Sequence, residues 1–476
     1  MHRRQLAGVI LASALITFDG TATTVALPAI ARDLSASISR LQWIANAPLL
    51  VLAAMLLTAG TLADRFGRIR TMRIGLIAFV AASCAAAAAP SDTALIAAKF
   101  AQGAAGAFML PAALAVLRET YTDADERARM FGVWAAWTGA ASAVGPLMAG
   151  ALVDVWSWRT VFLPSAVAGL VAVLLLGRAG TSSTATRSAP VPAAATVALM
   201  VLIGAMAYIL IQSPAAGGRG ALLTLAAILA IAAGTVLARD PRRQVLFPRE
   251  LLTARNCVPA NVTTFALYFG MFGLSFLVVL YVQQLLEYSA LWAAVTLLPI
   301  SILLLFAERL GRWTTVIGTR WVIVCGAVAA AVGIAWIGSS PHPVPFWSRM
   351  IVGTSVFGFA LSVAVSPLTH AAVAGVPETC AGTASGLNHA VVRAAGLVSV
   401  ALLGSIAASG VSDSVSAEGV QRALLTCAAV VGAGGILGGA FLRDDQPGGV
   451  PSSSDGLGVA SRTAPDAVSK PHGARR

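Results

Sequence analysis

The sequence predicts an all-α protein that crosses a lipid bilayer many times. Apolar residues make up 58% of its 476 residues, charged residues only 11%, and the mean hydropathy is +0.82. A soluble chain of this length could not bury so much apolar surface in one or two cores. Many of the apolar residues also form runs of about 20, the length at which a helix crosses the hydrocarbon layer. Lipid is therefore the expected solvent.

About fourteen such runs follow one another along the chain. They are Leu6–Ile30, Leu41–Leu62, Met72–Ala89, Thr93–Leu117, Met130–Val153, Thr160–Leu176, Pro192–Gln212, Ala221–Ala238, Val258–Val282, Leu291–Phe306, Trp321–Ile337, Trp347–Pro367, Ala381–Ala408 and Ala423–Phe441. The first run continues without a convincing cleavage site, so we expect a retained helix rather than a signal peptide.

Arginines between the runs predict the orientation of the chain. The net charge is +12, but the arginines lie in loops rather than on one polar face, which argues against a nucleic-acid partner. The loop after the second run carries Arg65, Arg68, Arg70 and Arg73, and the stretch after the eighth run is also basic. The loops that follow odd-numbered runs are poorer in arginine. By the positive-inside rule, we expect a plasma-membrane protein with both termini in the cytoplasm.

A short basic segment occurs twice, as Ala63–Arg68 and as Ala307–Arg312, about half the chain apart. Duplicated transporter halves predict such an echo, with the substrate site between the halves. We therefore expect a six-helix bundle over residues 1–177 and a second over 258–443. Residues 178–257 would form a linker, two extra membrane helices and a basic loop. The polar tail, residues 444–476, would be disordered.

Motifs for enzymatic chemistry are absent from the sequence. Neither Lys99 nor Lys470 lies in the Gly-Lys-Ser/Thr run of a phosphate-binding loop. The five cysteines show no CxxC spacing, and no catalytic triad, zinc pattern or EF-hand is present. We therefore expect no enzymatic activity, metal or cofactor, and a proton gradient as the energy source.

Asp19 lies about midway along the first apolar run. A carboxylate at this depth costs a few kcal/mol unless it faces water or a cation, so it is a candidate for binding and releasing a proton. A structural hydrogen bond to Thr21 or Thr23 is the alternative.

Two cations lie inside later runs and are the other candidates for proton or cation coupling. Lys99 in the fourth run could act beside a carboxylate, or its side chain could extend to the membrane surface. Arg393 lies about a dozen residues into the thirteenth run. The residues expected to line a substrate cavity are Thr23, Gln102, Gly103, Asn388 and His389. For His389, a hydrogen bond between helices is an equal explanation.

The fifth run contains a cluster of small residues and a proline. Gly139, Gly145 and Gly150 would allow another helix to approach closely, and Pro146 removes a backbone donor and should bend the helix. The pattern suits either generic packing or a kink at Gly145, Pro146 and Gly150 in a helix that moves.

Four motifs together resemble the major facilitator superfamily, and within it the fourteen-span drug:proton antiporters. Gly60-Thr61-Leu62-Ala63-Asp64-Arg65-Phe66-Gly67-Arg68 is similar to the signature of the loop between helices two and three. The stretch from Asp19-Gly20-Thr21 to Ala26-Leu27-Pro28 resembles the first-helix motif, with Thr24 where an Asn is usual. Lys99-Phe100-Ala101-Gln102-Gly103 resembles the fourth-helix motif, with Lys in place of Arg. Gly145-Pro146 fits the fifth-helix motif of exporters, although Ala141 and Ala149 replace glycines.

The resemblance implies two six-helix bundles of the major facilitator fold plus two extra central helices. It implies proton-coupled efflux of lipophilic or cationic small molecules by a monomer that alternates access across the bilayer. Conformational lock residues would be Gly60, Asp64, Arg65, Gly67 and Arg68 in the first half, and by the internal echo Glu308, Arg309, Gly311 and Arg312 in the second. Transport of one specific metabolite or lipid, which Pro48 in place of a cavity Tyr keeps open, and a non-transporting membrane sensor are the alternatives.

Overall fold

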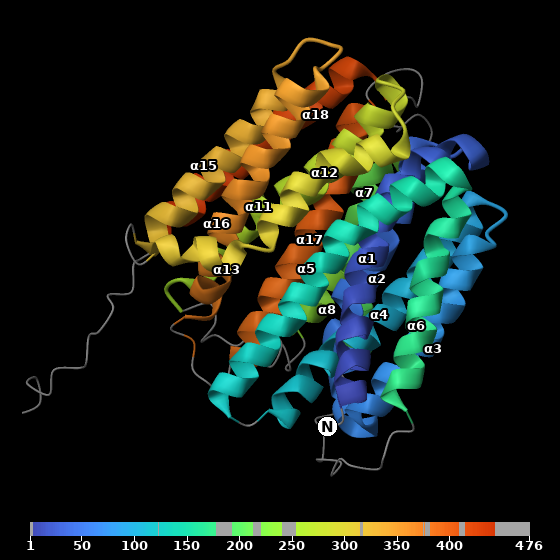
Figure 1. Cartoon of the computed structure of the whole chain (residues 1–476), viewed down its shortest axis with the longest axis vertical. Coiled ribbons are helices and arrows are strands. Elements are labelled where there is room, and N and C mark those ends of the chain that lie inside the picture. The colour runs from blue at the N-terminus through green and yellow to red at the C-terminus, as the bar shows by residue number, and fades with distance from the viewer. Residues whose placement is uncertain are drawn as a thin grey trace, which may run out of the picture. The chain divides into compact units, whose positions relative to one another are not determined.

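A computed structural model of the protein describes residues 3–442 apart from 122, 178–192, 213–219, 240–253, 315–317, 375, 377–380 and 409–414. Every regular element in this described part is helical (Figure 1). The first elements are α1 (Arg3–Leu34), α2 (Ile38–Phe66), α3 (Arg68–Ala87), α4 (Asp92–Thr120), α5 (Ala124–Val155), η1 (Trp158–Phe162), α6 (Leu163–Leu176), α7 (Ala193–Gln212) and α8 (Gly220–Arg239).

The remaining elements continue the helical chain to Phe441. They are α11 (Cys257–Leu280), η3 (Tyr281–Leu285), α12 (Ala290–Leu304), α13 (Ala307–Leu310), η4 (Gly311–Trp313), α15 (Thr319–Gly338), η5 (Phe346–Ile351), α16 (Val352–Val373), α17 (Ala381–Ala407) and α18 (Ala417–Phe441). The predicted polar linker, the basic loop after α8 and the tail from Asp444 lie outside the described residues.

Eleven spans in the described part are long and apolar enough to cross a membrane. Three further apolar helices are shorter, at Met200–Gln212, Leu223–Thr235 and Ala290–Leu304. Each of the predicted apolar runs overlaps a described helix, so the all-helical fold class is confirmed. The count of fourteen spans stays a prediction.

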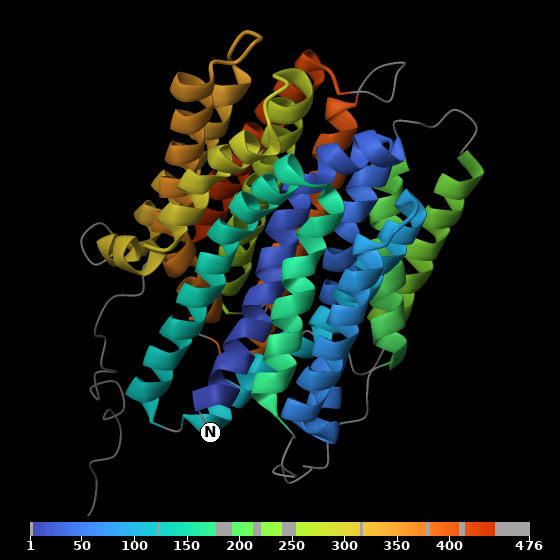
Figure 2. The same cartoon turned by 45° about the vertical axis from the view of Figure 1, so that its right-hand side comes forward.

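Helices α1 to α6 run alternately between two faces of the molecule. We name the first the Ser37 face, because the α1–α2 link lies there. Arg159 ties this link to the α3–α4 link by binding both Asp33 and the Ala89 carbonyl. The opposite face, named the Gly67 face, carries the α2–α3 link. Figure 2 shows this alternation, with the N-terminus at the end of α1 away from the Ser37 face.

Gly67 is the only residue between α2 and α3, and its φ of 92° lies in the region that favours glycine. A side chain there would be strained, so this position requires glycine. The echo of this segment in the second half behaves differently. Gly311 has a φ of −60°, and the positive φ of 90° falls on Gly318, directly before α15. The sequence repeat is therefore not a repeat of backbone conformation.

The helices of residues 1–177 pack mainly against one another, as do those of 258–443. In the first group, α1 packs on α5 and α6, and α4 on α2 and α3. In the second, α11 packs on α17 and α18, and α15 on α16 and α18. Four helix pairs of the described part join the groups, namely α5 with α12, α2 with α17, α1 with α11 and α1 with α12, while α7 contacts both α2 and α17.

Candidate functional site

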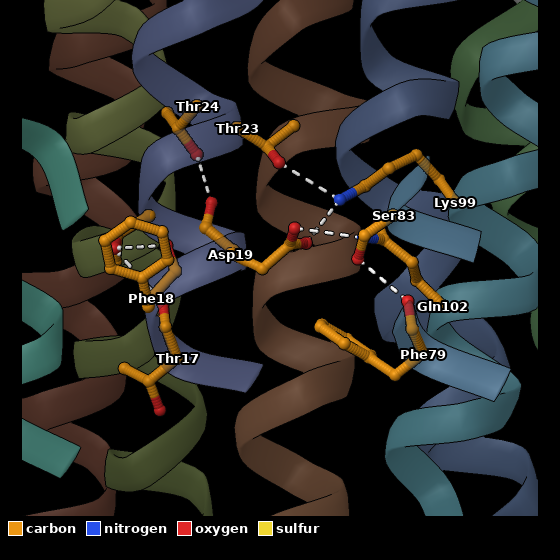
Figure 3. Close-up of polar contacts among 11 residues, drawn as sticks. Thr17, Phe18, Asp19, Thr23, Thr24, Phe79, Ser83, Lys99 and Gln102 are labelled. Carbon is orange, nitrogen blue, oxygen red and sulfur yellow. Dashed lines mark hydrogen bonds and ion pairs between the residues drawn. The ribbon is translucent and has the colours of Figure 1, made fainter. Parts of the chain in front are cut away.

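A buried ion pair links α1 and α4 in the first half of the chain (Figure 3). The Lys99 ammonium lies 2.5 Å from Asp19 Oδ2 and donates to Thr23 Oγ1 at 3.0 Å. Its side chain is 0% exposed, and that of Asp19 is 6% exposed. The Phe162 ring lies below the ammonium, 5.4 Å away, which adds a cation–π contact. Lys99 therefore does not extend to the membrane surface.

Gln102 extends this pair into a chain of hydrogen bonds. Its amide nitrogen donates to Asp19 Oδ1 at 3.1 Å and to Ser83 Oγ at 2.9 Å, and Ser83 in turn donates to the Phe79 carbonyl. The Gln102 amide oxygen is buried and has no hydrogen-bond partner among the described residues. A buried amide with a free acceptor can accept a proton donor after a half-turn of its side chain.

Helical spacing places these groups together. Asp19 and Thr23 are four residues apart and lie on one face of α1, and Lys99 and Gln102 are three apart on α4. Gly103 brings α4 against α2, since a Cβ there would lie 2.6 Å from the Pro48 carbonyl oxygen. The structure thus accounts for Gly103 through close packing rather than as a wall of a substrate cavity.

The polar residues of the second half lie between α11 and α17. Asn388 is buried and donates to Asn261 Oδ1 at 3.3 Å and Thr264 Oγ1 at 3.2 Å. His389 and Arg393 are half-buried, and Arg393 lies within electrostatic range of Tyr268 on α11. The structure therefore separates the predicted coupling residues, since Asp19 meets Lys99 while Arg393 belongs to a different cluster.

The predicted lock is only partly described. Arg68 donates to the Ala115 carbonyl at 3.2 Å and pairs with Glu119 at 2.7 Å, both on α4. Arg65 is exposed and lies over the Phe66 ring, and Arg309 is exposed. The side chains of Asp64, Glu308 and Arg312 lie outside the described residues, so their part in a lock stays a prediction. Gly60 has room around it, its nearest neighbour being Pro111.

The clearest polar contact between the two halves involves a residue that the sequence did not single out, Asp154. This carboxylate ends α5 and accepts the first two backbone N–H groups of α12, from Ala290 at 2.9 Å and Leu291 at 3.0 Å. An acid at a helix N-terminus satisfies unpaired donors and opposes the helix dipole. The sequence signal was present, because an acid directly follows the fifth predicted apolar run, two residues before Trp156.

Amides provide further contacts between the halves near the Ser37 face. Gln42 of α2 donates to the carbonyls of Val400 and Ala401 on α17 at 2.9 and 2.7 Å. Asn46 donates to the Leu397 carbonyl at 3.3 Å, and Gln283 of η3 donates to the Val25 carbonyl at 2.9 Å. These amides are visible in the sequence as polar residues within or beside apolar runs. The pattern of a single run does not show that each one binds a carbonyl on a distant helix.

The glycines of α5 face two different helices. A Cβ on Gly145 would overlap Thr21 of α1, and one on Gly150 would lie 2.7 Å from the Leu291 Cα of α12. Gly139 faces Leu305, the residue that directly follows α12. Pro146 lies within a continuous helix. The small residues of α5 therefore serve close packing on both the first and the second half.

Comparison with known proteins places this arrangement in a family. The Major Facilitator Superfamily profile matches residues 9–400. The chain belongs to the Major Facilitator Superfamily. It is a multi-pass membrane protein of a family of transporters, as the helices and their hydropathy also indicate. Its placement among the fourteen-span members stays a prediction.

Relatives of this facilitator-superfamily protein are named as resistance proteins. The methylenomycin A resistance protein of Bacillus subtilis (strain 168) is 31% identical over 399 residues, which cover 82% of this chain and 84% of the relative. The tetracenomycin C resistance and export protein of Streptomyces glaucescens is 31% identical over 419 residues, 86% of this chain and 76% of the relative. The inward-open xylose transporter XylE from E. coli shares the fold, with a TM-score of 0.62, 13% identity, and coverage of 93% of this chain and 96% of XylE.

Proposed function

We propose that this protein is a secondary active transporter that exports lipophilic or cationic small molecules, antibiotics among them, in exchange for protons. The observation that carries this proposal is the buried ion pair between Lys99 and Asp19, a carboxylate about midway along the apolar helix α1. Every other acidic residue on a described helix lies in its first or last turn, so Asp19 is the one carboxylate placed to carry a proton across. The names of the relatives support export of toxic compounds.

Proton binding at Asp19 would change the whole cluster. A protonated Asp19 no longer balances the charge of Lys99, and an uncompensated cation in this dry site is costly. The pair would therefore open, and Lys99 would seek water or another acceptor. Gln102 could stabilise the protonated acid, since its free amide oxygen can turn to accept the new O–H.

Alternating access would follow from the contacts between the halves. The Asp154 bonds to α12 and the Gln42 bonds to α17 hold the Ser37 face together. We assign this face to the outside of the cell, with both termini cytoplasmic, because the arginine-rich α2–α3 link lies on the other face. The Gly67 face, with Arg65 and Arg68, would close when the Ser37 face opens.

The finer organisation completes the proposal. We take residues 1–177 and 258–443 as the two bundles that rock against each other, with α7 and α8 as the extra pair, giving fourteen spans in a monomer. The substrate site would lie between the bundles, near Asn388, His389 and Arg393.

A narrow range of cargo is the second candidate. Each of the two relatives is named for one antibiotic. Pro48 stands where the family commonly has a cavity Tyr. Its backbone packs against Gly103, and its side chain has no group that could hydrogen-bond to a cargo. Transport of a single metabolite class would fit both facts.

Purified protein in proteoliposomes tests the proposed function. A compound panel, containing both named antibiotics and a cationic dye, is followed under an imposed pH gradient with and without an uncoupler. We expect uptake of at least one compound that collapses with the uncoupler and is lost in Asp19→Asn. The exposed carboxylate variant Asp125→Asn is the matched control and should transport normally. Undiminished pH-driven transport by Asp19→Asn would contradict the assignment of the proton site.

A further inference from the structure

Arg393 is a cation without a counter-charge in the second half of the chain. It lies about midway along α17 and is half-buried. Among the described residues it makes no hydrogen bond and no ion pair with an acid. An arginine at membrane depth is costly unless an anion, a carbonyl or water accompanies it.

The helices that pack on α17 carry acids only in a terminal turn, Asp64 at the end of α2 and Glu418 at the start of α18, and Glu418 pairs with Arg422. Helices α11, α12, α15, α16 and α17 contain neither Asp nor Glu. In the first half, Asp19 and Lys99 neutralise each other. The interior of the described helices therefore carries one net positive charge, and that charge is Arg393.

The position of Arg393 on α17 places it beside the junction of the halves. It lies one helical turn from Leu397, whose carbonyl accepts from Asn46 of α2, and two turns from Val400 and Ala401, which Gln42 binds. Residues four apart share a helix face, so Arg393 lies on the face that meets the first half, one turn closer to the Gly67 face than this contact. Its other neighbours within electrostatic range, Tyr268 and His389, carry hydrogen-bonding side chains.

We infer that Arg393 anchors an anionic group of the transported molecule, a carboxylate or similar oxyanion on an otherwise apolar compound. The guanidinium fork matches a carboxylate with two parallel hydrogen bonds, and the Tyr268 hydroxyl and the His389 ring can add a donor. Because this inference rests on the proposed function, it narrows the cargo from lipophilic or cationic molecules to lipophilic acids. A cation would meet the uncompensated charge of Arg393.

Three matched pyrene probes test the charge preference. They are 1-pyrenebutyrate, its uncharged methyl ester and the corresponding trimethylammonium compound, and their binding to the purified full-length protein is followed by fluorescence. We expect the carboxylate to bind most tightly. Arg393→Gln should weaken carboxylate binding by roughly ten- to a hundredfold, which is the effect of losing one or two charge-assisted hydrogen bonds. The affinity for the ester should stay within about twofold of the wild-type value. Arg393→Lys, which keeps the charge but not the fork, should fall between the two.

Arg422→Gln is the matched control, because it removes one positive charge from the same half at an exposed site paired with Glu418. It should leave all three affinities unchanged, and size-exclusion profiles check folding of each variant. Equal affinities of the wild type for all three probes, or an equal loss of all three in Arg393→Gln, would overturn the anion site. Gradient-driven transport of the ester or ammonium probe without the carboxylate would overturn it too, while leaving proton-coupled export intact. Binding of none of the probes would contradict the proposed export function and the anion site with it.

Discussion

The two halves of the molecule treat a buried cation in opposite ways. In the first half, Lys99 is fully enclosed and balanced by Asp19, Thr23 and the Phe162 ring. In the second, Arg393 is half-buried and makes no ion pair among the described residues, and the helices packed on α17 carry an acid only in a terminal turn, Asp64 on α2 and Glu418 on α18. A cation that is paired with a carboxylate of the protein suits the proposed proton exchange, because the pair is available in every transport cycle. A cation without a protein partner suits a ligand that binds and is then released.

The helix packing next to Lys99 is also more constrained than the packing next to Arg393. Gly103, four residues after Lys99, meets the backbone of Pro48, whereas Gly396, three residues after Arg393, meets the ring of Phe272. Backbone cannot move aside without shifting a helix, but an aromatic ring can turn. The first cluster is therefore held rigidly, and the second can adapt to a ligand.

Breaking the internal charge balance should have the largest effect. Lys99→Met leaves Asp19 buried without its cation, and we expect a loss of about 3–5 kcal/mol in the free energy of unfolding. The double variant Asp19→Asn with Lys99→Met removes both charges and should recover most of this stability while remaining inactive in coupled transport. Thermal unfolding in detergent and proteoliposome transport measure the two quantities. A double variant that is as unstable as the sum of the single ones would show that the two residues are not coupled.

Adding a methyl group at the two glycines tests rigid against adaptable packing. Gly103→Ala should cost about 1–3 kcal/mol, because the Cβ would lie 2.6 Å from a backbone oxygen. Gly396→Ala should cost less than about 1 kcal/mol, since the Phe272 ring can turn away. Gly132→Ala, on α5 with open space around it, is the control and should be neutral or stabilising. A larger loss at Gly396 than at Gly103 in thermal unfolding would reverse the comparison.

Placing an acid beside Arg393 should make the second half resemble the first. In Tyr268→Glu, the new carboxylate would pair with Arg393, so binding of 1-pyrenebutyrate should weaken by roughly tenfold, about 1.4 kcal/mol. Tyr268→Gln, which adds no charge, serves as the control and should keep the preference for the carboxylate probe. An unchanged preference in Tyr268→Glu would mean that Tyr268 is too far from Arg393 to matter.

Removing the end of the hydrogen-bond chain should have the smallest effect. Ser83→Ala takes one acceptor from the Gln102 amide, with an expected cost of about 1 kcal/mol and near-normal transport. Ser13→Ala, which loses only a bond to its own helix, provides the reference value. Thermal unfolding measures both, and a complete loss of transport in Ser83→Ala would assign Ser83 to the proton route itself.

Much of the fold followed from the sequence, because lipid imposes helices on long apolar runs and leaves few alternatives. The superfamily also followed from short motifs, such as that around Gly67. The candidate site was less accessible. Asp19 and Lys99 were identified singly, since each breaks an apolar run, but their pairing depends on how α1 and α4 pack. Asp154 and Gln42 were missed because their partners are backbone groups. Every residue type carries such groups, so the sequence does not show which of them a side chain will bind.

The Asp154 contact has a consequence for the resting state of the protein. Its two bonds join the end of α5 to the start of α12, so separating these helices on the Ser37 face would break them. If they contribute about 3 kcal/mol together, fewer than about one molecule in a hundred would be open on that face at equilibrium. In the proposed orientation, release of cargo would then require these two bonds to break, and a compound outside the cell would seldom meet an open site.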